Sequence, residues 1–469
     1  MDCYAKMKNN KRRQVSVIEE DRISNLPEHL IDSILERLPI QDVIRTSILS
    51  KKWRYKWRTM RAVVFDEQIS KKLAKNGAFG RHGFIRVINQ VLLLHKGSIS
   101  KFYLCIPDMF LDSFQDVNQW MLYLSTKGVK DFTIANSNQR YQLPRCVFSC
   151  LELRKLELNK CIFKPPLQFE GFLYLESLVF NNVDFTTDLG GTAINLPQLK
   201  KLIMRSCTKA YNLKIHATNL QVLLIMNCPD VMLLELLRSQ RLGMVCLTLM
   251  KPMEDFVRLE RMNLALMFAN MSRLRWFYID GHFLKVFIAE KPKWFPHAVN
   301  SLKRLWLIDF SLCDLDHLHG ALCLLRNSPN LEELRMMHTQ TESELMRCGE
   351  ETTSSHLESP GCLDQTLNRL RIVELSPLQG SRPQLLFVKL LLAQSPSLEK
   401  FTIQSNGTLD PYKRFNIAKD VMRFPRASPK AEMIYLDPNS FILMFVIIHI
   451  SNMVGGSEVL HLCRGGSAS

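Results

Sequence analysis

The stretch LRKLELNKC, residues 153–161, decides the fold, because its leucines and cysteine follow the pattern L-x-x-L-x-L-x-x-C. The same pattern returns in LKKLIMRSC (199–207) and LQVLLIMNC (220–228), and with asparagine in the ninth place in LEKFTIQSN (398–406). The alternation of apolar residues within each copy predicts a short strand. Its return along the chain predicts a stack of similar units.

Looser copies of this pattern occupy most of the chain. They begin at Ile99, Val129, Leu175, Met244, Leu274, Leu302, Leu331 and Leu370. From Leu153 on, successive starts lie 21 to 39 residues apart, and most intervals fall in or just beyond the range of leucine-rich repeats. One repeat cannot cover its own apolar face, so neighbouring repeats stack. The predicted fold is therefore α/β, a leucine-rich repeat solenoid of parallel strands joined by helices or irregular segments.

Helices are predicted between the early strands. Apolar residues recur at helical spacing from Phe84 to His95 and from Phe114 to Leu124, and Gly128 is expected to end the second helix. The longest interval between repeats contains the polar stretch 349–365, which is predicted to be a surface loop.

The residues between the repeat leucines are expected to face the concave side of the solenoid. Several are apolar and come from successive repeats: Val179, Ile203, Leu224, Met226, Trp276, Tyr278, Trp306 and Ile308. We expect them to form an exposed patch that binds a target protein. The alternatives are that another segment of the chain covers them, or that the coil curves differently.

The cysteines in the ninth place of the repeats are expected to be small buried residues rather than metal ligands or redox pairs. All 13 cysteines are scattered singly. Because the N-terminal residues also do not resemble a signal peptide, we expect reduced thiols and a location in the cytoplasm and/or nucleus. The basic residues from Lys8 to Arg13 are a candidate nuclear import signal.

Residues 22–61 are predicted to form a compact helical module. Pro27 suits a first helical turn, Pro39 stops that helix, and a second helix is expected to begin near Asp42. Forty residues rarely bury enough apolar surface to be stable alone. The module is therefore expected to bury its remaining apolar surface against a partner or the following domain.

A third helical segment is expected after Ser50. That serine is predicted to cap the segment, and Trp53 and Trp57 share one face at a spacing of four residues.

The same module resembles the plant F-box in DRISNLP (21–27), in Leu38-Pro39 and in LSKKWR (49–54) followed by Trp57. In that family the F-box binds the Skp-type adaptor of a Skp–cullin–F-box ubiquitin ligase. The resemblance implies that the adaptor contact includes Leu26, Pro27, Ile31, Ile34, Leu35, Leu38, Pro39, Val43, Ile44 and Leu49. For each aliphatic residue the alternative is packing within the module.

Residues 376–437 resemble the FBD domain that follows the repeats in plant F-box proteins. The matching stretches are SPL (376–378), QLLFVKLLL (384–392), SPSLEK (395–400) and RFPRASPKAE (423–432). The residues themselves predict a helix from Pro383 to about Ala393 and strands at 401–403 and 431–436. This segment is expected to cap the open end of the solenoid.

Motifs that would indicate catalysis were not found, neither a phosphate-binding loop nor a nucleophile elbow, a zinc-protease helix or a dinucleotide-binding turn. The cluster Cys313, Asp314, Asp316, His317 and His319 contains metal-ligand residue types. Leucines run through it at helical spacing, so it is expected to open a helix whose positive N-terminal end suits aspartate. No catalytic residue, metal or cofactor is therefore expected. The apolar run 441–450 is shorter than the roughly 20 residues that span a bilayer, so no membrane contact is expected either.

The predicted order is a disordered basic tail (1–20), an F-box (21–61), leucine-rich repeats (62–375), an FBD (376–437) and an unassigned tail (438–469). This order predicts a non-enzymatic substrate-recognition subunit of a Skp–cullin–F-box ubiquitin ligase. Its F-box would dock the Skp-type adaptor, and through it the cullin, and its repeats would bind an unknown target protein.

The net charge of +16 leaves two alternatives, a basic nucleic-acid-binding repeat protein and a generic scaffold. Binding to nucleic acid is disfavoured by the acidic residues expected on the concave side, which are Glu157, Glu333 and Glu374.

Overall fold

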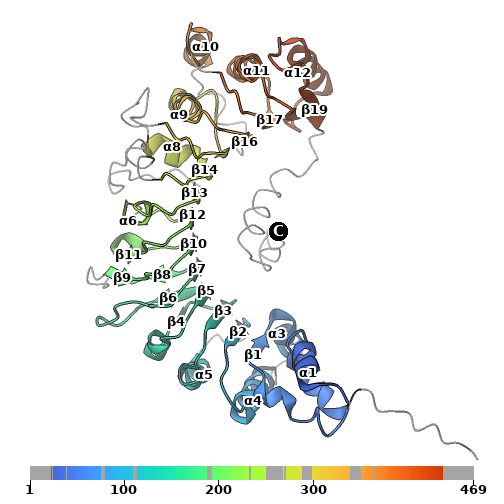
Figure 1. Ribbon diagram of the computed structural model, residues 1–469, viewed down its shortest axis with the longest axis vertical. Coiled ribbons are helices and arrows are strands. Elements are labelled where there is room, and N and C mark those ends of the chain that lie inside the picture. Colours follow the sequence, from blue (N-terminus) through green and yellow to red (C-terminus); the bar gives the residue numbers. More distant parts are fainter. Residues whose placement is uncertain are drawn as a thin grey trace, which may run out of the picture.

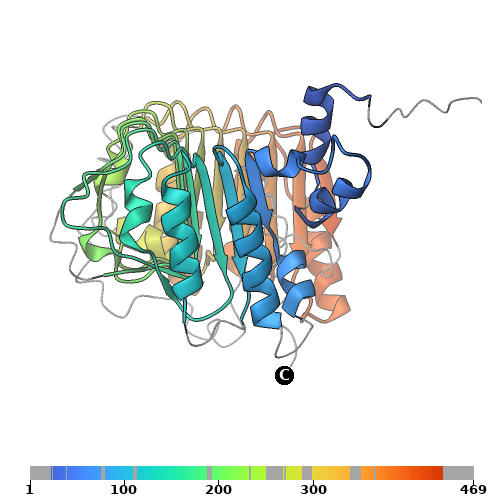
Figure 2. The ribbon, with the colours of Figure 1, turned by 90° about the horizontal axis from the view of Figure 1, so that it is seen from below.

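A computed structural model describes residues 23, 25–38, 40–74, 80–108, 113–186, 193–231, 234–249, 268, 271–287, 298–337, 350–363 and 366–436. The described residues form one curved body, with a helical module at the N-terminal end and a group of helices at the C-terminal end (Figure 1). A long sheet lines the concave side, and helices and short strands form the convex side (Figures 1 and 2). Pro39 and the two predicted tails, 1–20 and 438–469, lie outside the described residues.

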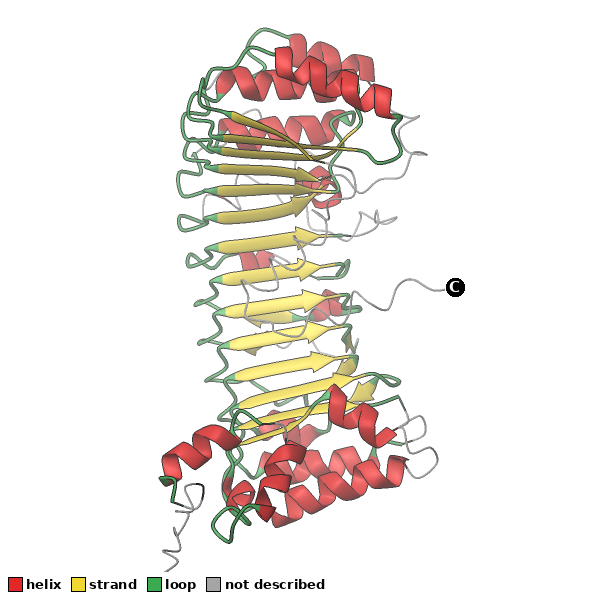
Figure 3. Cartoon of the chain, turned by 90° about the vertical axis from the view of Figure 1, so that its right-hand side faces the viewer, coloured by secondary structure: helices red, strands yellow, loops and turns green. Residues whose placement is uncertain are grey.

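The sheet has 14 strands in the order β1-β2-β3-β5-β7-β10-β12-β13-β14-β15-β16-β17-β18-β19. All of its pairings are parallel, and Figure 3 shows the arrows pointing the same way along the whole body. The strands are β1 (Ala62–Phe65), β2 (Lys101–Ile106), β3 (Asp131–Asn136), β5 (Lys155–Asn159), β7 (Ser177–Asn181), β10 (Lys201–Arg205), β12 (Val222–Met226), β13 (Met244–Thr248), β14 (Trp276–Asp280), β15 (Arg304–Ile308), β16 (Glu333–Met337), β17 (Ile372–Leu378), β18 (Lys400–Ser405) and β19 (Glu432–Leu436). This arrangement confirms the predicted solenoid.

The repeat leucines fill the space between the sheet and the convex layer. Leu156 pairs in register with Leu178, which pairs with Leu202, and all three are buried. Stacking of equivalent leucines from strand to strand gives every repeat the same core, which a single repeat could not close by itself.

One predicted repeat start was wrong. The copy placed at Met244 begins at Leu242, and the leucine positions of the pattern are held by Leu242, Val245 and Leu247, all fully buried in the core. Met244 instead opens β13 and belongs to a second apolar cluster, outside this core. The error arose because every residue of β13 is apolar or small, so period-two alternation is lost there.

The strands of the middle repeats end in a left-handed turn. The backbone φ is positive at Lys160, Asn182, Ser206 and Asn227. The N–H of each of these residues donates to a carbonyl of the next strand, for example from Lys160 to Asn181 at 2.9 Å. The ninth-place cysteines Cys161, Cys207 and Cys228 follow such turns as buried free thiols, as predicted.

The convex layer changes character along the body. It begins with helices α3 (Glu67–Ala74), α4 (Gly80–Leu94) and α5 (Gln115–Ser125). Its middle consists of β4 (Tyr141–Gln142), η4 (Arg145–Ser149), β6 (Cys161–Phe163), β8 (Asp184–Phe185), β9 (Ala193–Asn195), η5 (Ala210–Asn212), β11 (Lys214–His216) and α6 (Leu234–Leu237). It ends with α8 (Gly281–Phe287), α9 (Leu315–Arg326), α10 (Glu350–Glu358), α11 (Arg382–Gln394) and α12 (Pro411–Arg423).

The two early helices were predicted correctly. Helix α4 buries Phe84, Ile88 and Val91, and α5 buries the apolar side of its own stripe. Gly128 adopts a positive φ of 70° in the turn that follows α5, whose C-cap is Thr126. The glycine therefore lies in the turn beyond the helix and is not the residue that ends it.

The prediction of a surface loop at 349–365 was wrong, because helix α10 lies there. Thr353, Ser354 and Leu357 are buried, and α10 packs against α9 and α11. Small hydroxyl residues make this inner face, which lacks the stripe of large apolar residues by which a helix is recognised.

The C-terminal segment continues the solenoid and supplies the last strands of the sheet. The predicted helix and both predicted strands are present as α11, β18 and β19, and the strands continue the register of the sheet. Helix α12 packs against α11.

The N-terminal module contains α1 (Glu28–Leu35), α2 (Ile40–Arg45), η1 (Thr46–Ile48) and η2 (Lys56–Thr59). The third helix predicted after Ser50 is instead a set of turns leading into η2, and the Ser50 hydroxyl is buried without a hydrogen-bond partner. Long-range bonds hold this segment: Lys52 Nζ donates to the carbonyl of Leu26 at 2.6 Å, and Trp53 Nε1 donates to that of Ile23 at 3.2 Å.

The module is joined rigidly to the solenoid. Its buried residues, including Trp57 and Met60, belong to the same continuous core as β1 and β2. The backbone N–H of Lys96 also donates to the carbonyl of Arg58 at 2.6 Å, and a ring nitrogen of His95 lies 2.7 Å from the carbonyl oxygen of Met60.

Candidate functional site

The N-terminal module leaves apolar side chains exposed although it shares a core with the solenoid. Ile48 is 87% exposed, Leu49 47% and Ile34 40%. These side chains lie on α1 and at the end of η1, so two elements of the module contribute. Exposed apolar side chains grouped on a small module are typical of a protein-binding surface.

The nine described residues of the predicted adaptor contact fall into three groups, and the tenth, Pro39, lies outside the described residues. Pro27, Ile34 and Leu49 are exposed. Leu26, Leu38 and Ile44 are half-buried and pack against the core. Ile31, Leu35 and Val43 are fully buried, so the alternative stated for each aliphatic residue, packing within the module, describes these three.

Sequence reasoning missed four further exposed side chains of the module. They are Ile23, Leu30, Ile48 and Tyr55. Leu30 and Ile34 form one exposed row on α1, whereas Ile31 and Leu35 form the adjacent buried row. Helical spacing finds both rows, but it does not say which row the rest of the chain covers.

Contacts within the module fix α1 in place. Lys56 Nζ lies 2.9 Å from Glu28 Oε1, at the first turn of α1. The hydrogen bond from Lys56 and its positive charge hold the pKa of the Glu28 carboxyl below its usual value. The ion pair is exposed and adds little to stability, so the orientation of α1 is set mainly by its buried residues Ile31 and Leu35.

The concave face carries one side chain from each strand in a continuous ladder. The in-register residues are Val64, Tyr103, Thr133, Glu157, Val179, Ile203, Leu224, Cys246, Tyr278, Trp306, Arg335, Glu374, Thr402 and Ile434. The middle of the ladder is apolar and both flanks are polar. The predicted target-binding residues lie on this face, as expected from the alternation.

The expected exposure of these residues was wrong for five of the eight. Val179, Ile203, Leu224, Tyr278 and Trp306 are at most 5% exposed and pack together with Met244, Cys246 and Met337, a group we call the concave cluster. Met226, Trp276 and Ile308 are half-buried against it. Parallel strands lie about 4.8 Å apart, so large side chains in register cover one another.

Burial in the concave cluster also affects its titratable groups. It raises the pKa of the Cys246 thiol to about 12 and the pKa of the Tyr278 hydroxyl above its usual value. Both groups are neutral at physiological pH, so the cluster is apolar in charge as well as in composition.

A network of charged residues borders the concave cluster at β15–β17. Glu333 lies 3.2 Å from Arg304 and 2.6 Å from Arg335, and it accepts a hydrogen bond from Trp306 Nε1 at 3.1 Å. Arg335 also pairs with Glu374 at 3.2 Å, and its guanidinium lies 4.6 Å from the Trp306 ring. Two of the three acidic residues that disfavoured nucleic-acid binding, Glu333 and Glu374, thus neutralise the arginines beside them.

The opposite flank of the concave cluster carries basic residues. Lys155 lies 3.4 Å from Glu157. Burial, together with the positive charge of Lys155, lowers the pKa of Lys201 to about 8. The concave face therefore presents an apolar centre between two polar flanks of mixed charge.

The cluster around Cys313 opens helix α9, as predicted. The Asp314 side chain accepts hydrogen bonds from the backbone N–H groups of Asp316 and His317 at 3.0 and 3.1 Å. His317 accepts one from Ser311 at 3.2 Å, and burial lowers its pKa to about 4. Among the described residues no group of three or more His, Cys, Asp or Glu is placed to hold a metal ion.

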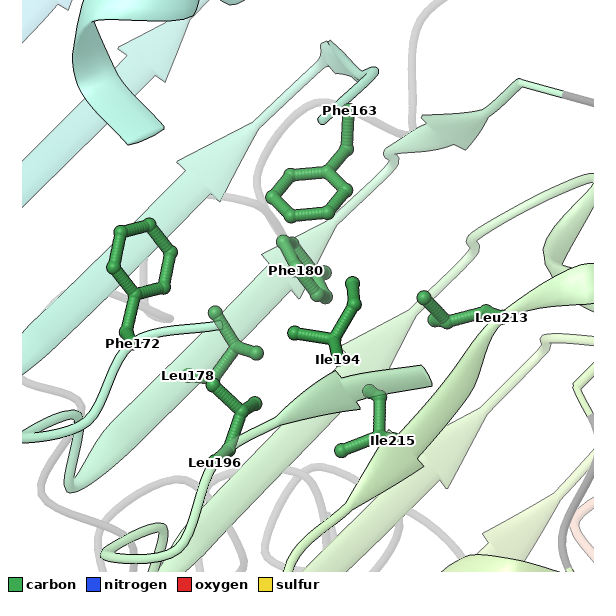
Figure 4. Close-up of a pocket in the computed structure, with 8 residues that line it drawn as sticks. All are labelled: Phe163, Phe172, Leu178, Phe180, Ile194, Leu196, Leu213 and Ile215. Carbon is green, nitrogen blue, oxygen red and sulfur yellow. The ribbon is translucent and has the colours of Figure 1, made fainter. Parts of the chain in front are cut away.

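A small cavity lies inside the core of the middle repeats (Figure 4). Its volume is about 10 Å³, and it is lined by Phe163, Phe172, Leu178, Phe180, Ile194, Leu196, Leu213 and Ile215. That volume is near the minimum for one water molecule, and an apolar lining gives water no partner. The cavity is a packing gap rather than a ligand site.

Among the described helices, none combines the length and the apolar character that a membrane-spanning helix requires.

Two stretches of the chain match known protein domains. Residues 23–63 match the F-box domain, and residues 91–279 match the LRR domain described as At1g61320/AtMIF1. The F-box/FBD/LRR-repeat protein At1g13570 of Arabidopsis thaliana is 32% identical over 417 residues, which cover 89% of this chain and 98% of the relative. The probable FBD-associated F-box protein At1g32375 of the same plant is 22% identical over 88% of this chain and all of that protein.

Proposed function

Because this chain belongs to the plant F-box/FBD/LRR-repeat family, we propose that it is the substrate-recognition subunit of a Skp–cullin–F-box ubiquitin ligase. The F-box docks a Skp-type adaptor, which connects it to the cullin, and the repeats hold a target protein. In this role the chain acts as an adaptor and not as the catalyst. Its contribution is to raise the effective concentration of the target near the activated ubiquitin.

The observation that carries the adaptor proposal is the exposed apolar surface of Ile34, Ile48 and Leu49 on a rigid module. Full burial of one such side chain contributes about 1.5–3 kcal/mol. Because the module shares its core with the solenoid, the backbone that carries these side chains is folded before binding, so binding must order only the side chains themselves. The half-buried Leu26, Leu38 and Ile44 extend this proposed contact.

The concave face is the proposed site for the target protein. Met226, Trp276 and Ile308 provide its accessible apolar area, and Val179, Ile203, Leu224, Tyr278 and Trp306 support that area from beneath. The paired charges of Arg304, Glu333, Arg335 and Glu374 favour a protein of mixed charge over a phosphate backbone.

Adaptor docking is tested by measuring the affinity of the purified adaptor for the full chain and for Ile48→Asp and Ile34→Asp. Each variant places a charge on an exposed position, so we expect at least tenfold weaker binding with an unchanged melting temperature. Leu93→Asp on α4 is the matched control, because Leu93 is 79% exposed but lies outside the module. Equal affinity of all four proteins would refute the proposed docking surface.

A further inference from the structure

Helix α12 lies at the C-terminal end of the body, far along the chain from the F-box (Figure 1). It carries a second group of exposed apolar side chains. Tyr412, Phe415 and Met422 on α12 are 73%, 64% and 59% exposed. They recur at intervals of three and seven residues and thus lie on one face of the helix. The opposite face carries the buried Ile417 and Val421, which attach α12 to the body.

Basic residues occur along α12 and in the segment that follows it. Lys413, Lys419, Arg423, Arg426 and Lys430 are all exposed, and none of them makes an ion pair with a described residue. Lys419 lies within the stripe, between Phe415 and Met422. Asp410, Asp420 and Glu432 carry negative charge at exposed positions in the same segment, and Asp410 also caps α12 by accepting the backbone N–H groups of Tyr412 and Lys413. The five basic residues outnumber these three acidic ones.

The layer structure of the body also stops at this point. Helices α9, α10, α11 and α12 pack one against the next, and among the described residues α12 has no further helix beyond it. Strand β19 pairs with β18 and with no other described strand. The outermost repeat of a solenoid ordinarily carries a polar outer face, whereas this one presents aromatic and methionine side chains.

We propose that this surface, defined by Tyr412, Phe415, Lys419, Met422 and Arg423, binds an acidic amphipathic helix of a partner protein. The apolar face of that helix packs along the stripe, which from Tyr412 to Met422 spans about 15 Å, or roughly three helical turns. Its acidic residues lie against the lysine and arginine side chains. The apolar face of an amphipathic helix can cover Tyr412, Phe415 and Met422, whereas the charged phosphate backbone of a nucleic acid offers no such face.

This inference does not depend on adaptor docking, since the two surfaces lie at opposite ends of the sheet order. It can be tested with the full chain and two fluorescent synthetic 18-residue peptides of identical composition, rich in leucine and glutamate. In one peptide the leucines form a helical stripe, and in the other the order is scrambled. Binding is measured by fluorescence anisotropy at two salt concentrations.

We expect the striped peptide to bind at least tenfold more tightly than the scrambled one, with weaker binding at high salt. The variant Phe415→Ser/Met422→Ser and the variant Lys419→Glu/Arg423→Glu should each lose at least tenfold. Leu122→Ser is the control, because Leu122 is 61% exposed on α5, away from this surface. Equal binding of both peptides, or unchanged binding by both double variants, would overturn the proposal.

Three further measurements distinguish other occupants. The first uses phosphatidylserine vesicles and a uridine oligonucleotide as probes. If both double variants abolish binding of one of these probes but still bind the peptide, the occupant is a lipid surface or RNA and not a protein. Concentration-dependent dimerisation that the double variants abolish would make a second copy the occupant. Peptide binding that appears only after deletion of residues 438–469 would assign the surface to the chain's own C-terminal residues. Each of these results contradicts the proposed partner.

Discussion

Tyr278 and Trp306, on the adjacent strands β14 and β15, meet edge to face with ring centroids 4.8 Å apart. Both side chains are at most 1% exposed. The pair forms the largest part of the concave cluster, so the rings that suggested a binding surface in the sequence are part of the packed interior of the folded chain.

The burial of Trp306 predicts a large effect of its substitution on stability. Trp306→Ala should lower the free energy of unfolding by roughly 3–5 kcal/mol, because it removes a buried ring and leaves a cavity. Trp276→Ala should cost less, since Trp276 is half-buried. Chemical denaturation of both variants tests this, and equal losses of unfolding free energy would contradict the assigned burial.

The same burial affects the choice of variant for testing target binding. An aspartate at Tyr278 or Trp306 would unfold the chain, so Trp276→Asp is the better variant.

Glu333 is buried and is expected to stabilise the fold through its pairs with the half-buried Arg304 and Arg335. Glu333→Gln removes the charge that faces Arg304 and Arg335, and should cost about 1–3 kcal/mol of unfolding free energy. Glu399→Gln is the matched control, because its pair with Arg371 is more than half exposed and such pairs contribute about 0–1 kcal/mol. The prediction fails if urea denaturation gives the two variants the same stability.

Asp280 should make stability depend on pH. Burial raises the pKa of its carboxyl to about 7, although the backbone N–H groups of Phe283 and Leu249 donate to it. At pH 4 the group is largely protonated in the folded chain, and above pH 7 the folded state must hold a buried charge. The stability that Asp280 contributes is therefore lost as pH rises from about 4 to 7.

The variant Asp280→Asn isolates this effect. Its stability relative to the unaltered chain should increase by roughly 1–4 kcal/mol from pH 4 to pH 8, since one pKa unit corresponds to about 1.4 kcal/mol. Thermal melts across this range measure the difference between the two proteins. A difference that is constant with pH would show that the carboxyl titrates normally.

Two glycines should respond to alanine in opposite directions. At Gly171 the φ angle is 134°, and a Cβ would lie 1.9 Å from the carbonyl oxygen of Asn195, so Gly171→Ala should cost at least about 2 kcal/mol. At Gly83, inside helix α4, a Cβ would meet no atom within 4 Å. Gly83→Ala should therefore stabilise by about 0.5–1 kcal/mol. Melting temperatures that shift in the same direction for both would contradict this assignment.

Local patterns predicted the parts of the chain in which one surface is buried and repeated. The repeat leucines, the ninth-place cysteines and the stripes of α4 and α5 were all correct, because alternation and helical spacing report directly on a single buried face. The same signals failed where the buried face contained few large apolar residues, or where both faces of a strand were apolar. Helix α10 buries hydroxyl residues rather than large apolar ones, and β13 is apolar on both faces.

The candidate surfaces were harder to predict than the fold. On α1, the row of Leu30 and Ile34 and the row of Ile31 and Leu35 are equally apolar, and only the packing of the rest of the module exposes the first. The exposed stripe of α12 was not predicted either, because an apolar stripe in a sequence is read as core by default.

By itself the sequence determined the solenoid, the strand that each repeat contributes and the helical character of the N-terminal module, since these follow from residue spacing within a few turns or strands. Only the tertiary structure decided which apolar side chains remain available to a partner. The physical reason is that exposure depends on segments distant in the chain: neighbouring strands bury Tyr278 and Trp306 together, whereas no described neighbour covers Ile48 or Phe415.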